Sequence, residues 1–224
     1  MSASDKTISL ILKDLTNVHE NLLSLSEDIW DSIDHNNQEK LDEGYQFKKE
    51  FNRLLDIFEQ NSSEISTLVS QFIGIKADEE AREVSKDAAE NQRIIKELNK
   101  DTPHSLTEYF TYKRPYAFIF DGCAYTDTLN WSDLYTSFAS CLAKKDPALL
   151  KSMADNPDYM SNQNKKYYSS SDKDVRLPRK IMNDFFIETN LSANHIVKKM
   201  MEMLNVFKIP LDNITIYLRQ DRNA

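Results

Sequence analysis

The first 102 residues contain no proline, and their apolar residues recur at alternating steps of three and four. Proline interrupts helices because it lacks a backbone donor and clashes with the preceding turn. Steps of three and four keep side chains on one face of a helix, as in a coiled coil. Glutamate, a good helix former, occurs 12 times in this segment and 3 times in the rest. The segment is therefore predicted to form long helices.

Three apolar seams divide this segment. They consist of Ile8, Ile11, Leu15, Val18, Leu22, Leu25 and Ile29; of Phe47, Phe51, Leu54, Phe58, Asn61, Ile65, Leu68 and Phe72; and of Ala77, Ala81, Val84, Ala88, Asn91, Ile95 and Leu98. The polar run at 35–37 separates the first two seams. We expect helices over 5–34, 39–73 and 77–100, arranged as an antiparallel hairpin or a three-helix coiled coil.

Two interpretations of the seams are open: they close within one bundle, or one of them is donated to another chain. The helices are long for a globular domain, and the third seam is rich in alanine, which buries little apolar area. Asn61 and Asn91 would set the register if buried, or would simply be solvated at a seam edge. The predicted partner interface comprises Leu15, Leu22, Leu25, Ile29, Phe51, Leu54, Phe58 and Asn61.

The remainder of the chain has a different composition. It holds all six prolines and 17 of the 23 aromatic residues, with a net charge of +2 against −10 for the first 102 residues. We expect two domains, an acidic helical one at 1–102 and a small α+β module at 103–224. The fold class is α+β overall and mainly α.

Within the module, strands are expected at 116–120, 124–129, 183–189 and 214–218, forming one short sheet. An Asp121-Gly122 hairpin turn joins the first two strands. Helices are expected after the caps Asn130, Asp146 and Ser192, and a polar loop at 155–174.

Four runs in the module carry a resemblance to a known group of proteins. They are 115–122 (PYAFIFDG), 130–134 (NWSDL), 186–194 (FIETNLSAN) and 214–218 (ITIYL). Together, over about 103–220, they resemble a C-terminal module associated with prokaryotic restriction-like and anti-phage defence proteins. Such a module usually accompanies a catalytic domain. Because only helices accompany it here, the resemblance implies a subunit of a multi-protein defence system.

We therefore expect a non-catalytic accessory or scaffold subunit that needs no cofactor. Its helices would join it to another copy or to a larger protein, such as a nuclease or an ATPase with coiled-coil arms. Its C-terminal module would dock a second protein through the polar residues Glu188, Asn190, Ser192 and Asn194.

Several other classes are disfavoured by residue counts. Three glycines are too few for a clustered dinucleotide-binding turn or a P-loop, and the four histidines lack metal-site spacing. Cys141 is expected in the core, and Cys123 paired with His195 as a nucleophile is a weak alternative. There is neither a signal-peptide pattern nor an apolar run long enough for a membrane span, so we expect a cytoplasmic protein without membrane contact.

Weak nucleic-acid binding is the alternative function. Cations of the module occur beside tyrosines, a mixture that neutralises phosphates and stacks on bases. The competing interpretation is ordinary solubility charge, since a net charge of +2 is far from a strongly basic footprint. The candidate contacts, centred on the 165–180 loop, are Lys113, Arg114, Lys165, Lys166, Arg176, Arg179 and Lys180.

Overall fold

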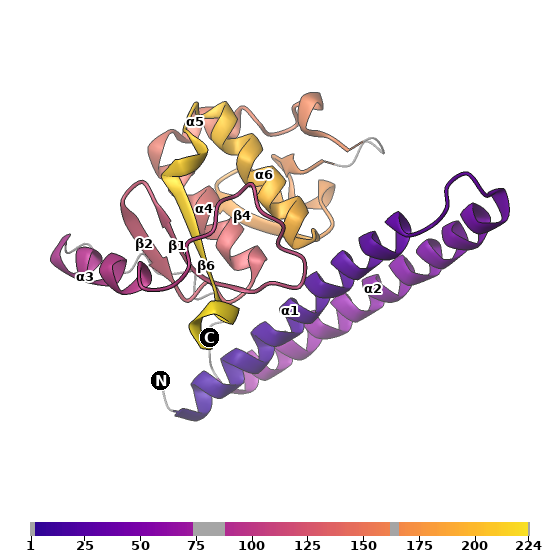
Figure 1. Cartoon of the computed structure of the whole chain (residues 1–224), viewed down its shortest axis with the longest axis horizontal. Coiled ribbons are helices and arrows are strands. Elements are labelled where there is room, and N and C mark those ends of the chain that lie inside the picture. Colours follow the sequence, from indigo (N-terminus) through magenta and orange to yellow (C-terminus); the bar gives the residue numbers. More distant parts are fainter. Residues whose placement is uncertain (1–2, 74–87, 162–165, 224) are drawn as a thin grey trace. The chain divides into compact units, whose positions relative to one another are not determined.

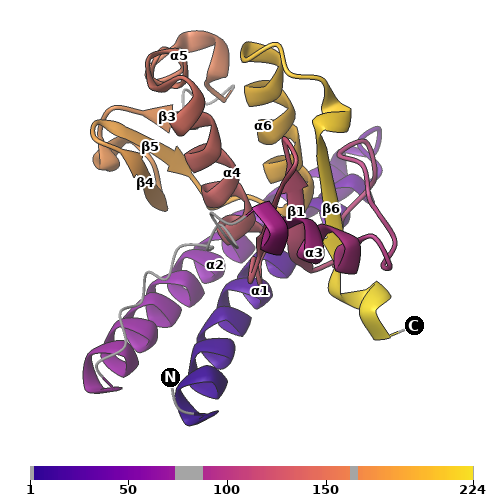
Figure 2. The same cartoon turned by 90° about the vertical axis from the view of Figure 1, so that its left-hand side faces the viewer.

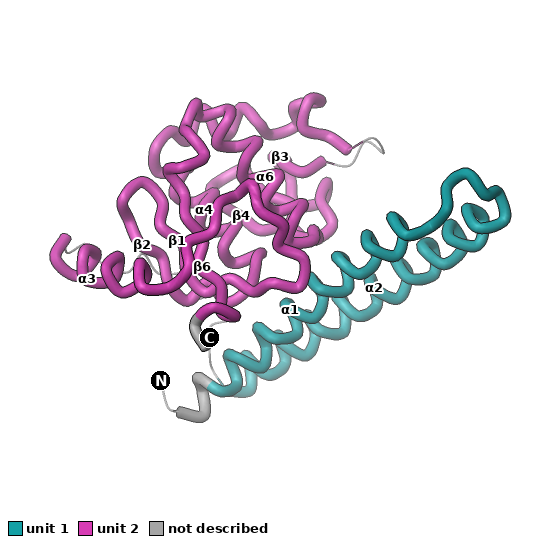
Figure 3. The backbone as a smooth tube through the Cα atoms, viewed as in Figure 1, with its two compact units in different colours: residues 1–79 teal, residues 80–224 magenta. Residues whose placement is uncertain are grey.

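The computed structural model describes residues 3–73, 88–161 and 166–223 of the chain. Long helices precede a set of short strands and helices, so the prediction of a mainly helical α+β protein is confirmed (Figure 1). The chain divides into two compact units, residues 1–79 and residues 80–224 (Figure 3). We call them the hairpin unit and the globular unit.

The hairpin unit consists of two long antiparallel helices, α1 (Ala3–Asp31) and α2 (Gln38–Ile73) (Figure 1). The polar run at 35–37 lies in the connection between them, as predicted. Asn37 starts α2, because its side-chain oxygen accepts a hydrogen bond from the Lys40 backbone N–H at 3.1 Å, the usual role of a helix cap. The helices expected at 5–34 and 39–73 agree with these bounds to within three residues.

Small and polar residues lie beside larger apolar ones along the line where α1 meets α2. Three contacts mark this line: Ile33 with Gly44, Ser26 with Lys48, and His19 with Phe58. A Cβ added to Gly44 would lie 2.1 Å from the Ile33 Cδ1 atom, so glycine permits the close approach. The Lys48 ammonium donates to the Ser26 hydroxyl at 2.7 Å and to the Ser26 carbonyl at 2.9 Å.

The third helix, α3 (Ala88–Leu98), belongs to the globular unit. Its Leu98 is buried in a cluster with Tyr116, Ala117 and Tyr217 of a sheet. The boundary expected at 102/103 therefore moves to 79/80, and α3 packs on a sheet instead of completing a three-helix coiled coil. The expected start of this helix at 77–87 lies outside the described residues.

The first sheet of the globular unit has the strand order β2-β1-β6. Its strands are β1 (Pro115–Phe120), β2 (Cys123–Thr126) and β6 (Ile214–Leu218), and all neighbours are antiparallel. The predicted Asp121-Gly122 turn joins β1 to β2, with φ angles of 53° and 75°. Positive φ at both positions is what such a tight hairpin turn requires.

The globular unit also contains a second small sheet, whereas we expected one sheet. Its order is β3-β5-β4, with β3 (Tyr168–Ser169), β4 (Pro178–Met182) and β5 (Phe185–Glu188). The strand expected at 183–189 begins with a turn at Asp184, whose φ is 58°. Short 3₁₀ helices occur within the expected loop, at Pro157–Tyr159 and Asp172–Asp174, and also at Leu211–Asn213 and Arg219–Asn223.

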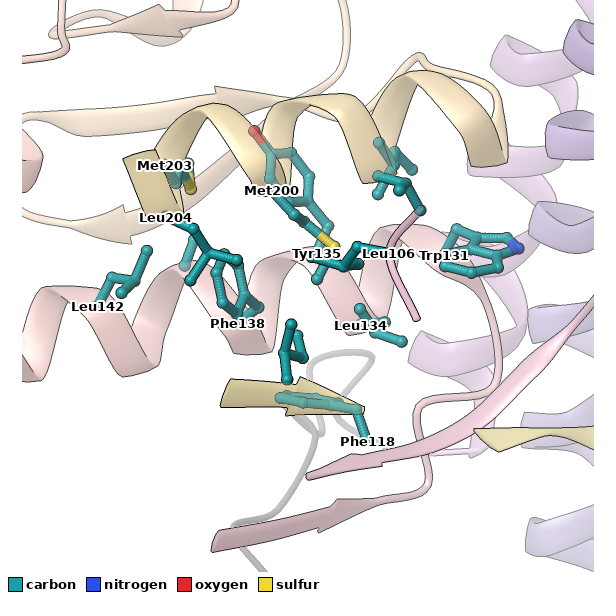
Figure 4. Close-up of a cluster of buried hydrophobic side chains, with 14 of the residues drawn as sticks. Leu106, Phe118, Trp131, Leu134, Tyr135, Phe138, Leu142, Met200, Met203 and Leu204 are labelled. Atoms are coloured by element: carbon teal, nitrogen blue, oxygen red, sulfur yellow. The ribbon is translucent and has the colours of Figure 1, made fainter. Parts of the chain in front are cut away.

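Three helices supply most of the core of the globular unit. They are α4 (Trp131–Lys145), α5 (Pro147–Lys151) and α6 (Ala193–Val206), capped by Asn130, Asp146 and Ser192 as predicted. Helix α4 lies between the two sheets (Figure 2). Its apolar side chains meet those of α6 in a buried cluster (Figure 4), so these two helices form the centre of the core.

Candidate functional site

Both helices of the hairpin unit expose a row of apolar side chains. We call the rows the α1 stripe, formed by Ile11, Val18 and Leu25, and the α2 stripe, formed by Phe47, Leu54, Ile57, Asn61, Ile65, Leu68 and Phe72. Leu54 is 50% exposed, Leu68 69% and Phe72 91%. Large contiguous patches of exposed apolar side chains usually mark interaction surfaces.

The two stripes lie on the same side of the hairpin. In both helices an exposed apolar residue directly precedes a residue that touches the other helix: Val18 before His19, Leu25 before Ser26, Phe47 before Lys48, and Ile57 before Phe58. One residue back along an α-helix turns the side chain by about 100°. Because the helices are antiparallel, this turn has opposite senses in the two helices when they are viewed from one end. Both stripes therefore face the same way and form one apolar face.

The predicted partner interface is divided by this arrangement. Five of its members are half-buried: Leu15, Leu22, Ile29, Phe51 and Phe58. The other three, Leu25, Leu54 and Asn61, are exposed and belong to the stripes. Some seam residues thus pack within the hairpin, and others belong to the exposed apolar face. Sequence reasoning missed Ile57, which is 43% exposed, because it lies one residue before the seam position.

Acidic residues dominate the rest of the hairpin. Residues 1–73 hold 14 Asp and Glu against 6 Lys and Arg, a net charge of −8. Some are neutralised locally, as where the Arg53 guanidinium lies 2.6 Å from the Glu50 carboxylate. Burial lowers the pKa of the Lys48 ammonium between the helices, although the nearby Glu27 and Asp31 carboxylates oppose this shift. The hairpin unit that carries the apolar face is therefore strongly acidic.

Glu188, predicted to dock a partner, serves the fold of the globular unit. Its carboxylate accepts hydrogen bonds from the backbone N–H groups of Arg176 at 2.6 Å, Leu177 at 3.1 Å and Asn190 at 2.7 Å. The residue is 6% exposed. This carboxylate thus satisfies three backbone donors near the end of the second sheet, which would otherwise be costly to bury.

The other predicted docking residues are also engaged within this unit. The Ser192 side chain caps α6. The Asn194 amide accepts from the Phe110 N–H and donates to the Thr111 hydroxyl, both at 2.8 Å. The unusual composition of segment 188–194 therefore has a structural cause. Docking through Glu188, Asn190, Ser192 and Asn194 stays a prediction, with few polar groups left to serve it.

The predicted nucleic-acid contacts are spread over separate elements. Lys113 lies over the Phe110 ring, 5.7 Å from its centroid, and Arg114 next to it is half-buried. Arg176, which precedes β4, is exposed. Within β4, Lys180 is exposed and Arg179 is half-buried. Lys165 lies outside the described residues.

Lys166 is occupied by carboxylates. Its ammonium lies 2.8 Å from Asp155 Oδ1 and 2.6 Å from Asp174 Oδ2. Hydrogen bonding to these two groups raises the pKa of Lys166, and the Lys166 hydrogen bond is the main reason why the pKa of Asp155 falls to about 2. A phosphate would have to compete with two carboxylates at this position, so the charge of Lys166 does not favour nucleic-acid binding.

Asn91 has a structural role that its position in the predicted seam did not indicate. Its side-chain amide donates to the Gly122 carbonyl at 2.8 Å and accepts from the Ala124 N–H at 2.9 Å. It therefore fastens α3 to the β1–β2 turn and does not set a coiled-coil register.

A histidine bridge was missed altogether. His104 Nδ1 and Nε2 each lie 2.7 Å from a carboxylate oxygen, of Glu108 and Asp221 respectively. Glu108 follows His104 by four residues, but Asp221 lies near the other end of the chain. No local sequence pattern therefore predicts that both carboxylates contact His104.

The two cysteines lie in different surroundings. Cys141 is buried and its thiol donates to the Ser137 carbonyl at 3.1 Å, while Cys123 is half-buried at the start of β2. Over residues 3–73, 88–161 and 166–223, no three His, Cys, Asp or Glu side chains are grouped to hold a metal ion. In the same ranges, no helix combines the length and apolarity needed to cross a bilayer.

Comparison with protein-family models, with curated proteins and with solved structures finds no match to this chain. The candidate site is therefore defined by its geometry, and the apolar face of the hairpin unit is its main feature.

Proposed function

We propose that this chain is a non-catalytic assembly subunit whose hairpin unit joins polypeptides through its apolar face. The observation that carries the proposal is the pair of exposed stripes on one side of α1 and α2. Burying a Leu, Ile or Phe side chain contributes about 1.5–3 kcal/mol before ordering costs. The stripes supply enough such anchors for a stable interface.

The globular unit would then bind a second protein and so bring it into the assembly. It has a well-packed core of its own, which suits a rigid docking module. The resemblance of segments 115–122, 130–134, 186–194 and 214–218 to modules of anti-phage defence proteins supports a prokaryotic defence complex as the setting. The partner in such a complex would be an effector, such as a nuclease or an ATPase with coiled-coil arms.

Co-expression with the products of neighbouring genes tests this function. The tagged full chain is compared with a double variant of the face, Leu54→Glu with Leu68→Glu. A matched control, Asn52→Glu with Ser63→Glu, places the same charges at exposed positions on the opposite side of α2. We expect a stoichiometric complex with the wild type and the control, and at least tenfold less with the face variant.

Equal recovery of a partner together with equal self-association of all three proteins would contradict the proposal, because assembly would then be independent of the apolar face. Circular dichroism of the purified variants checks that both retain their helices.

A further inference from the structure

We propose that the apolar face binds a second copy of this chain, related to the first by a two-fold axis that passes beside Asn61. This inference rests on the proposed function, since it names the polypeptide that covers the face. The two hairpins would form a four-helix bundle, with α2 against α2 and α1 against α1, each pair antiparallel.

The central part of the α2 stripe, from Leu54 to Leu68, is symmetric about Asn61. Four residues before and after it lie Ile57 and Ile65, and seven residues before and after it lie Leu54 and Leu68. All four are at least 43% exposed. When a helix packs antiparallel on its own copy about a two-fold axis, positions equally far from the centre face each other. Isoleucine would therefore meet isoleucine, and leucine would meet leucine.

Two of the three residues of the α1 stripe, Ile11 and Val18, are centred at the same level of the hairpin. The midpoint between Ile11 and Val18 falls next to residue 14. Three contacts show which residues of α1 and α2 lie side by side: Ile33 with Gly44, Ser26 with Lys48, and His19 with Phe58. In each pair the two residue numbers add up to between 74 and 77. The midpoint between Ile11 and Val18 therefore lies beside Asn61, and Leu25 lies outside this symmetric pair. One axis, perpendicular to the helices, thus relates both α2 to α2 and α1 to α1, and pairs Ile11 with Val18 of the other copy.

Asn61 suits the position on the axis. An amide carries both donors and an acceptor, so two copies of the same side chain can hydrogen-bond to each other. A single polar residue at a packed seam position fixes register because a shifted pairing would bury an unmatched amide. A different protein would need to supply its own complementary group opposite Asn61, whereas a second copy brings one by symmetry.

The stripes have apolar surface left to bury. Their apolar residues are between 36% and 91% exposed, and a standard stable interface buries about 800 Å² on each partner. The net charge of −8 on residues 1–73 opposes pairing of like hairpins. This repulsion is screened by salt, so pairing should strengthen as salt is added. A basic partner would show the reverse dependence.

Sedimentation velocity of the full-length protein over a range of concentrations, at 50 mM and 500 mM salt, measures this directly. We expect a dimer whose dissociation constant is lower at the higher salt. Leu54→Glu with Leu68→Glu should raise the dissociation constant at least 100-fold, because it places four carboxylates in facing layers. The control Asn52→Glu with Ser63→Glu should change it by less than threefold.

Cross-linking tests the position of the axis. In a Cys123→Ser background, Asn61→Cys should give a covalent dimer with a short bismaleimide, whereas Asn52→Cys on the opposite side should not. A dimer that links through position 52 and not through position 61 would overturn the proposed register.

A wild-type monomer at every concentration and salt would overturn the second copy as the occupant. If that monomer still binds a co-expressed partner in a face-dependent manner, the proposed function stands and only the choice of partner fails. If neither dimer nor face-dependent partner is found, both proposals fail.

Discussion

The two units of this protein place their apolar side chains in opposite ways. In the globular unit, Trp131, Tyr135 and Phe138 are at most 2% exposed and lie within one packed cluster (Figure 4). In the hairpin unit, Ile65, Leu68 and Phe72 are between 49% and 91% exposed, while Lys48 and Ser26 meet between the helices. The globular unit therefore buries its apolar side chains within itself, whereas the hairpin unit leaves a row of them exposed, as the proposed association requires.

This difference has a thermodynamic consequence. A helix in water gains most of its stability from packing of its apolar face and little from intrinsic propensity. The hairpin unit should therefore become more stable when its face is covered, and its unfolding should depend on protein concentration. Unfolding of the globular unit should not. The two tryptophans separate the signals, because Trp30 lies in α1 and Trp131 in α4.

The largest effect is expected from the core of the globular unit. Phe138 is 0% exposed and lies edge-on to the Phe120 ring at 5.1 Å. Phe138→Ala should lower the free energy of unfolding by about 3–5 kcal/mol through lost burial and a residual cavity. Urea unfolding followed by Trp131 fluorescence in a Trp30→Phe background measures it. The hairpin transition, followed by circular dichroism, should stay in place. If both transitions shift together, the two units do not fold independently.

The next largest effect concerns the buried carboxylate of the globular unit. Glu188→Ala leaves three backbone N–H groups without their acceptor, and should cost about 3 kcal/mol. Glu188→Gln keeps one acceptor oxygen and should cost roughly half as much. Equal and small losses in both variants, measured by the same urea titration, would show that water replaces the carboxylate.

Much of the helical architecture was predictable because its signals are local. Steps of three and four, the capping residues Asn130 and Ser192, and the Asp121-Gly122 turn each specify their own segment. Such signals do not state which side of a helix meets which neighbour. Two helices cover only part of each other, so the predicted seam was divided between residues such as Phe51, which face inward, and Leu54, which does not.

The missed features depend on distant partners. Strand β4 contains Pro178, Arg179 and Lys180 and has little strand character of its own, since its hydrogen bonds come from pairing with β5. Asn91 occupied a heptad position, yet its partners lie 31 and 33 residues further along the chain. In the same way, the polar residues of segment 188–194 resembled a docking site because their internal partners could not be foreseen.

A moderate effect is expected at the attachment of α3. Asn91→Ala removes both bonds to the β1–β2 turn and should cost about 1–2 kcal/mol. The control is Arg93→Ala in the same helix, whose side chain is 72% exposed and forms an ion pair with Glu90. Because solvent screens such an exposed pair, this variant should lose little stability. If the two variants lose equal stability in urea, Asn91 is no more than a surface residue.

The smallest effect is a pH dependence of the globular unit through His104. Burial of the ring opposes its charge, but hydrogen bonds to Glu108 and Asp221 outweigh burial and raise the pKa of His104 above 6.5. A raised pKa means that the folded state holds the proton more tightly than the unfolded state. The extra stability is therefore fully present below pH 6.5 and is lost as the pH rises through the raised value.

The free energy of unfolding measured at pH 6 and at pH 9 isolates the contribution of His104. Wild type should lose up to about 1 kcal/mol more than His104→Asn over this interval, a size typical of partly exposed ion pairs. The variant should still fold, because the backbone of His104 pairs with Ile216 at 2.9 Å and 3.0 Å without using the ring. Glu108→Gln and Asp221→Asn should each remove part of the dependence. The hairpin transition should not share it, and a pH response confined to that transition would place the titrating group outside the globular unit.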